Sequence, residues 1–150
     1  MPSVPPPNIR RTVLAHAAFA LASCVLPARV KAQQSSANSN PDPRWHEQAV
    51  RMRMLAESWS DQPYGAVLVL NGTLTGEGPS RVVKDRDPNA HAERVAIRDA
   101  QRKLGRQGLD GSLLYSTSRP CSLCEAAAAK AGVSRMYFGP ALTDAGRPHS

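Results

Sequence analysis

The chain has 150 residues, a hydrophobic content of 41% and a formal net charge of +7. This length suits one domain with one core, and no apolar stretch of about 18 residues predicts a membrane-spanning helix. Four basic residues and no acid lie in residues 1–32, so the rest of the chain carries only +3. So small a charge is weak support for a nucleic-acid-binding protein.

Residues 1–32 have the features of a cleaved export signal, which is excluded from the fold. Arg10 and Arg11 precede an alanine-rich, moderately apolar segment, and small residues near Ala32 suit a signal peptidase. The arginine pair favours the twin-arginine type, which carries folded cargo, over an ordinary secretory signal. We therefore expect an exported, periplasmic protein. A minority alternative makes Cys24 the lipid-modified N-terminus of a lipoprotein, because residues 21–24 resemble a lipobox.

Residues 33–44 are rich in Ser, Asn, Gln and Pro and predict a flexible leader before a domain at residues 45–140. From Trp45 to Trp59, apolar residues recur every three or four positions, which predicts an amphipathic helix with the tryptophans as core anchors. The apolar run at residues 66–70 predicts a strand buried on both faces. Asn71 and Gly72 then predict a hairpin turn into a short return strand at residues 73–75, which residues 76–79 end.

A charged loop at residues 80–89 leads into a predicted helix at residues 91–104, with a buried stripe formed by Val95, Ala96, Ala100 and Leu104. A strand at residues 113–115, a helix from Pro120 to Gly132 and a fourth strand at residues 135–138 follow. Residues 141–150 are expected to form a short tail. The alternation of strands and helices predicts an α/β fold, a three-layer α/β/α sandwich around a mixed sheet.

Two short strings carry the candidate chemistry. His91, Ala92 and Glu93 form the first, and Cys121 and Cys124, preceded by a proline, form the second. Both strings fall where predicted helices begin, and the dipole there favours the thiolates that a metal requires. His91, Cys121 and Cys124 would bind Zn²⁺ and leave a fourth position for water, while Glu93 would carry protons.

Other uses of the two cysteines stay open at this point. In an oxidising compartment the C-x-x-C pair could form a disulfide. A structural zinc site would normally need a fourth protein ligand, for which His46 and His149 are the candidates. Each string is a weak signal alone, and the order H-x-E followed by P-C-x-x-C is the signature of zinc-dependent nucleobase deaminases.

These strings, together with residues 63–69, 87–90 and 96–98, resemble the cytidine/deoxycytidylate deaminase superfamily. Within it, the sequence is most similar to the branch of tRNA adenosine deaminases and guanine deaminases. The resemblance covers residues 45–139 and implies a helix-sheet-helix sandwich, a zinc hydrolase and often a homodimer. It implies metal-ligand roles for His91, Cys121 and Cys124 and a proton-shuttle role for Glu93.

The same resemblance implies substrate contacts at Ser80 and Ala92. Ser80 stands where members of this branch have an asparagine that contacts the edge of the base. Arg119 stands where members commonly carry a glutamate. Some members continue into a further strand and C-terminal helices, whereas here about ten residues follow the fourth predicted strand.

The leading hypothesis is hydrolytic deamination of an amino-substituted nucleobase or nucleoside, with release of ammonia. A tRNA adenosine deaminase is the second hypothesis, for which the basic surface would comprise Arg81, Lys84, Arg86, Arg94, Arg98, Arg102 and Lys103. We expect most of these residues to form a solvated helix face instead, and we do not expect a nucleic-acid partner. The third hypothesis is a catalytically reduced, zinc-bound interaction module, against which the presence of Glu93 argues.

Overall fold

The computed structural model describes residues 41–150, so the predicted signal at residues 1–32 and most of the predicted leader lie outside the described residues. The described elements are, in chain order, α1 (Pro43–Ser58), β1 (Gly65–Leu70), β2 (Thr73–Pro79), α2 (Ala92–Leu104), β3 (Leu113–Ser116), α3 (Ser122–Ala131), β4 (Arg135–Phe138) and β5 (Thr143–Gly146). None of the helices in this part of the chain is long and apolar enough to cross a membrane.

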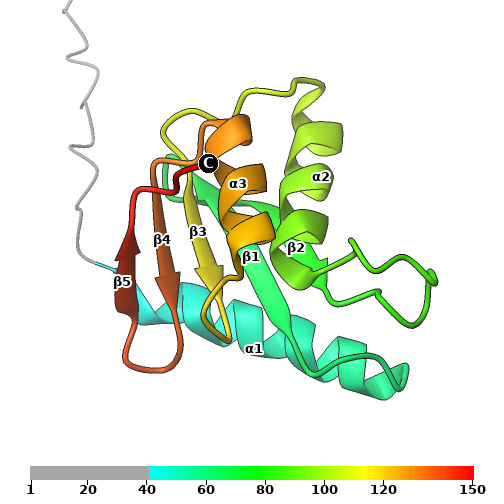
Figure 1. The fold of residues 1–150 in the computed structure, drawn as a ribbon. Coiled ribbons are helices and arrows are strands. Elements are labelled where there is room, and N and C mark those ends of the chain that lie inside the picture. Colours follow the sequence, from blue (N-terminus) through cyan, green and yellow to red (C-terminus); the bar gives the residue numbers. More distant parts are fainter. Residues whose placement is uncertain (1–40) are drawn as a thin grey trace, which may run out of the picture. The chain divides into compact units, whose positions relative to one another are not determined.

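The five strands form one mixed sheet in the order β2-β1-β3-β4-β5. β1 runs antiparallel to both β2 and β3, β3 and β4 are parallel, and β5 returns antiparallel to β4. Helix α1 covers one face of the sheet, and α2 and α3 lie side by side on the other (Figure 1). This arrangement confirms the predicted three-layer sandwich.

The core has two sides because successive strand residues point to opposite faces of a sheet. Val67, Tyr115 and Tyr137 pack with Ala49 of α1 on one face. On the other face Leu68, Leu114 and Met136 pack with residues of α2 and α3. The predicted burial of residues 66–70 on both faces is therefore confirmed for β1 up to its last residue.

Strand β2 is longer than predicted, because Gly76 and Gly78 belong to it and do not end it. A Cβ atom at Gly78 would lie 2.0 Å from the carbonyl oxygen of Ala92, and one at Gly76 would lie 2.2 Å from that of Ala96. Glycine at both positions lets the backbone of α2 pack directly on the strand. The glycines that looked like a turn are thus the contact surface for α2.

The predicted tail also contains structure, since residues 143–146 form the edge strand β5. Its sequence, Thr-Asp-Ala-Gly, has no apolar alternation, so its backbone pairing with β4 holds it in place. Arg135 Nη1 lies 2.9 Å from Asp144 Oδ2 across the two strands. The expectation of a tail throughout residues 141–150 was wrong.

Two details of the predicted helices also differ. Trp45 packs against the core as expected, but Trp59 lies under the cations of Lys84 and Arg81, with Lys84 Nζ 3.4 Å from the ring centroid. In α2 the buried stripe is rotated toward Ile97, and Leu104 is 39% exposed. This rotation brings Glu93 into the interior.

Candidate metal centre

The two predicted strings meet at the N-termini of α2 and α3. His91 is the N-cap residue of α2, and Cys121 is the N-cap residue of α3 with Cys124 in the first turn of that helix. His91 Nδ1 lies 3.6 Å from Cys121 Sγ and 3.5 Å from Cys124 Sγ, and the two sulfur atoms are 3.4 Å apart. The fold therefore brings His91 together with a cysteine pair that lies 30 and 33 residues further along the sequence.

These distances fit a zinc ion. Zinc binds sulfur at about 2.3 Å and nitrogen at about 2.0–2.1 Å, so neighbouring ligand atoms in a tetrahedron are about 3.5–3.8 Å apart. The two nitrogen–sulfur distances lie in this range, and the sulfur separation of 3.4 Å is slightly shorter. A disulfide would require a sulfur separation of about 2.05 Å, and both cysteines are free. In residues 41–150, the group able to hold a metal consists of His91 and the two cysteines, and neither His46 nor His149 joins it. Among the described residues 41–150, the site therefore offers three candidate protein ligands and no fourth.

The electrostatics of the site also favour a bound cation. Cys124 is buried, and burial together with the nearby charge of Glu93 raises the pKa of its thiol. A buried thiolate next to a carboxylate is costly unless a metal ion compensates the negative charge. The N-terminal ends of α2 and α3 add partial positive charge on the same side.

Glu93 lies against the ligand group but is not part of it. Its side chain is in the first turn of α2, the residue is 6% exposed, and its Oε2 accepts a hydrogen bond from Cys124 Sγ at 3.4 Å. Burial raises the pKa of Glu93, and hydrogen bonds from its own backbone and from Cys124 only partly oppose this. A carboxyl group that is buried beside a candidate metal site is a candidate for taking up and releasing a proton.

The structure places the two predicted substrate-contact residues in different surroundings. Ala92 is buried as the first residue of α2, between His91 and Glu93. Ser80 is completely buried, and its hydroxyl group donates a hydrogen bond to Asp61 Oδ1 at 2.9 Å. Asp61, the partner of Ser80, was not identified as a candidate residue from the sequence. A contact of Ser80 with substrate stays a prediction.

A separate hollow of about 730 Å³ lies between α1, the edge of β2 and α2, and its lining includes none of the four residues of the metal centre. Its charged side chains pair with one another. Lys103 Nζ lies 3.3 Å from Glu77 Oε2, and Arg81 Nε lies 2.7 Å from Asp85 Oδ2. We therefore assign the chemistry to the metal centre and not to this hollow.

Comparison with known proteins agrees with this geometry. Residues 39–140 match the family described as the cytidine and deoxycytidylate deaminase zinc-binding region. A tRNA-specific adenosine deaminase of Buchnera aphidicola subsp. Schizaphis graminum is 34% identical over 106 residues, which cover 71% of this chain and 70% of that protein. Guanine deaminase of Bacillus subtilis is 40% identical over 83 residues, covering 55% of this chain and 53% of that enzyme.

A solved structure from a study of A-to-I editing by tRNA:A34 deaminases superposes with a TM-score of 0.63 at 37% identity, covering 65% of this chain and 71% of that chain. The chain thus spans about half the length of the guanine deaminase and about 70% of the length of these two tRNA deaminases. These matches confirm the predicted branch, the predicted fold and zinc as the cofactor. The chain belongs to the cytidine and deoxycytidylate deaminase zinc-binding family.

Proposed function

We propose that this protein is a zinc-dependent hydrolase that converts an amino-substituted nucleobase or nucleoside to its oxo form and releases ammonia. The observation that carries the proposal is the buried carboxyl group of Glu93 beside three candidate metal ligands, with no fourth in the part of the chain that the structure describes. A purely structural zinc site would be closed by a fourth protein ligand and would have no use for a proton carrier. The tRNA-specific adenosine deaminase and guanine deaminase relatives support the same reaction class.

His91, Cys121 and Cys124 hold the metal in this mechanism. Zinc at such a site makes water acidic enough to act as a nucleophile near neutral pH. Glu93 accepts the proton of the attacking water and delivers it to the ring nitrogen of the substrate. The oxygen of that water bonds to the ring carbon, and the bond from this carbon to the amino group breaks. Glu93 carries the second proton of the same water to the departing amino group, so that the oxo product and ammonia form.

Ammonia release from cytosine, cytidine, guanine and adenine tests the proposal. The isosteric variant Glu93→Gln keeps the shape of the side chain and loses the proton carrier, so kcat should fall by about 10² to 10⁴. Its zinc content should stay near one per chain, whereas His91→Ala should lose zinc. Equal turnover by the wild type and Glu93→Gln would refute the mechanism. Full zinc content without turnover on the whole panel would favour the interaction module.

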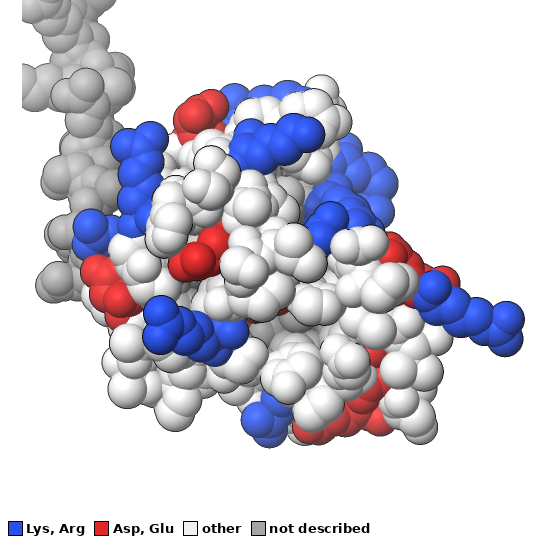
Figure 2. Space-filling model, viewed as in Figure 1, with Lys and Arg blue, Asp and Glu red and all other residues white. Residues whose placement is uncertain are grey.

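Deamination of tRNA is the second candidate, and the names of several relatives favour it. The contacts of the basic residues support a small substrate instead, because Arg98 and Lys103 are paired with acids and Arg94 is bonded to Asn89. Figure 2 shows the Lys and Arg side chains scattered around one face and not gathered in a single patch. Salt-dependent binding of an RNA stem-loop would support the tRNA reading. The absence of binding at low salt would remove it.

We also propose that the chain is exported through residues 1–32 by the twin-arginine route, and that the mature protein is a homodimer. The support for export is the arginine pair and the alanine-rich segment after it. Replacing Arg10 and Arg11 by lysine should keep the protein in the cytoplasm, as cell fractionation would show. Lipid labelling that disappears in Cys24→Ser would favour the lipoprotein alternative. Sedimentation velocity of the purified protein tests the dimer.

A further inference from the structure

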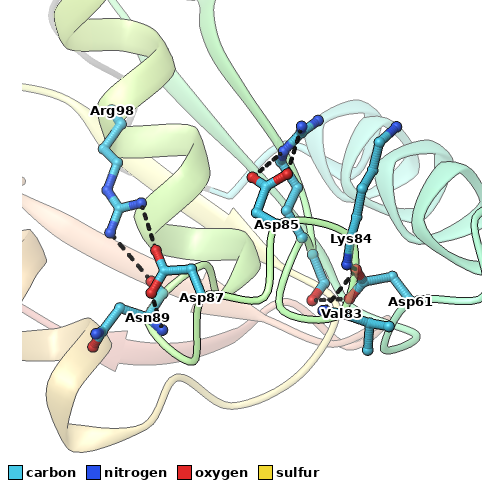
Figure 3. A network of polar contacts seen from close by, with 9 residues as sticks. Asp61, Val83, Lys84, Asp85, Asp87, Asn89 and Arg98 are labelled. Carbon is cyan, nitrogen blue, oxygen red and sulfur yellow. Dashed lines mark hydrogen bonds and ion pairs between the residues drawn. The ribbon is translucent and has the colours of Figure 1, made fainter.

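Asp61 is a buried carboxylate between α1 and β1 that the proposed chemistry does not use. The residue is 7% exposed. Its Oδ1 accepts hydrogen bonds from Gln62 N at 2.7 Å and Ser80 Oγ at 2.9 Å. Its Oδ2 accepts from Val83 N at 3.0 Å and Lys84 N at 2.8 Å, contacts that Figure 3 shows converging on one side chain. Three of these four donors belong to the segment that follows β2.

The four contacts require an acceptor with no proton of its own. Burial raises the pKa of Asp61, but the hydrogen bonds from Lys84, Gln62, Ser80 and Val83 outweigh burial and hold it below its usual range. The side chain is therefore a carboxylate at neutral pH. Hydrogen bonds to a buried, charged acceptor are stronger than those between neutral groups.

The segment that Asp61 holds is connected to the metal centre through the backbone. Arg81 N donates to the carbonyl oxygen of Ala90 at 3.0 Å, so residues 81–90 form a loop that is closed at its base. Ala90 is 1% exposed and immediately precedes His91. The start of this loop is thus fixed by Asp61 through Ser80, Val83 and Lys84, and its end leads directly into the first metal ligand.

The loop has other tethers, but they lie at the surface. Arg98 of α2 reaches Asp87 Oδ2 at 3.5 Å and the carbonyl oxygen of Asn89 at 3.3 Å, and Arg81 pairs with Asp85 (Figure 3). The Arg98 side chain is 50% exposed, and solvent-exposed ion pairs contribute little to stability. The buried carboxylate of Asp61 is therefore the strongest single anchor described for this loop.

We propose that Asp61 is a positioning residue for the metal centre. It holds the segment from Ser80 to Lys84, and the bond between Arg81 and Ala90 transmits that position to His91. This inference rests on the proposed role of His91 as a zinc ligand. Cys121 and Cys124 are placed by the first turn of α3, so loss of Asp61 displaces His91 relative to a sulfur pair that stays where it is.

Zinc affinity, measured by competition with a chromophoric chelator well below the unfolding temperature, tests the inference. Asp61→Asn places an amide donor opposite the backbone N–H groups of Val83 and Lys84. We expect it to weaken zinc binding about tenfold, because the loss of a contact that positions a metal ligand commonly lowers metal affinity about 10- to 100-fold. Ser80→Ala removes one of the four bonds and should give a smaller loss in the same direction. Asp85→Asn is the matched control, because it also removes a carboxylate charge that contacts the loop at residues 81–90 and leaves the Asp61 contacts in place.

The outcomes separate this inference from the proposed function. If His91→Ala binds zinc as tightly as the wild type, the metal assignment fails. If His91→Ala loses zinc while Asp61→Asn and Ser80→Ala retain wild-type zinc affinity, the positioning role is refuted and the metal assignment stands. A lower unfolding temperature of the zinc-free variants with unchanged zinc affinity would show a purely structural role and would also refute it. Asp85→Asn should match the wild type, and an equal loss in this control would refute a specific role of Asp61.

Discussion

The close packing of α2 on β2 makes Gly78→Ala a sharp test of how the fold positions the site. The added Cβ would lie 2.0 Å from Ala92 O, 2.5 Å from Ala96 N and 2.9 Å from Ala96 Cβ. Ordinary contact begins at 3.4 Å, so strand and helix must separate by about 1.4 Å at this point. Ala92 stands between His91 and Glu93, and the displacement therefore acts on the proposed metal ligand and on the proposed proton carrier together.

The expected magnitudes follow from these distances. Overpacking of this kind costs about 1–3 kcal/mol of the free energy of unfolding. The lower backbone entropy of alanine in the unfolded chain returns about 0.4–1 kcal/mol of that loss. A misplacement of about 1 Å at a reacting centre can lower the rate about 100-fold. Activity should thus fall far more than stability alone would account for.

Gly76→Ala is the matched control, because it makes the same substitution in the same strand against the same helix. Its Cβ would lie 2.2 Å from the carbonyl oxygen of Ala96, one turn further from the metal centre. Urea unfolding should show similar destabilisation for both variants. Ammonia release and zinc affinity, measured where both are folded, should fall more in Gly78→Ala. Equal losses of activity in the two variants would refute the argument that Gly78 acts on the site through Ala92.

Three further predictions concern metal, pH and the sheet edge. Removing zinc with a chelator should lower the unfolding temperature reversibly, since free zinc at 100 times its dissociation constant stabilises the fold by about 2.7 kcal/mol. The pKa of Asp61 is lowered in the folded state. The Asp61 carboxylate therefore stabilises the fold at pH values above its unfolded pKa of about 3.9, and this stabilisation is lost as the pH falls through the folded pKa. Asp61→Asn should therefore have a lower free energy of unfolding at neutral pH and lose less of it as the pH is lowered. The same acid dependence of stability in Asp61→Asn and the wild type would contradict the assignment of Asp61 as a buried carboxylate. Asp99 Oδ2 accepts a hydrogen bond from Glu77 N at 3.0 Å on the edge strand β2. Asp99→Ala should therefore lower the free energy of unfolding in urea by about 1–3 kcal/mol. Light scattering should detect association of the variant through the N–H group left unpaired at this edge.

The meeting of the two strings was predictable from the sequence because each lies at the start of a helix. Cys121 and Cys124 are related by one turn of α3, and the preceding proline marks where that helix begins. His91 and Glu93 likewise straddle the first residue of α2. The local rules of helix initiation thus place each string at a helix N-terminus. Only the packing of α2 beside α3 is then needed to bring the two N-termini together.

The features that the sequence did not reveal depend on long-range contacts. Gly76 and Gly78 have the composition of a turn, and their role is visible only when α2 lies on β2. Asp61 is separated by 19 to 23 residues from the segment it binds, and nothing in its neighbourhood indicates that partner. Strand β5 lacks an apolar pattern and exists through its pairing with β4.

Within the metal centre, too, some residues are placed by local contacts and others by long-range contacts. The sulfur atoms of Cys121 and Cys124 are held by one helix turn, with Cys124 N donating to the carbonyl oxygen of Cys121 at 2.9 Å. His91 and Glu93 have their places set by the packing at Gly78 and by the loop that Asp61 anchors. Substitutions remote from the metal should therefore change the geometry of the histidine and the carboxylate relative to the sulfur pair. The chain would then keep a C-x-x-C pair able to bind metal while losing the arrangement needed for proton transfer.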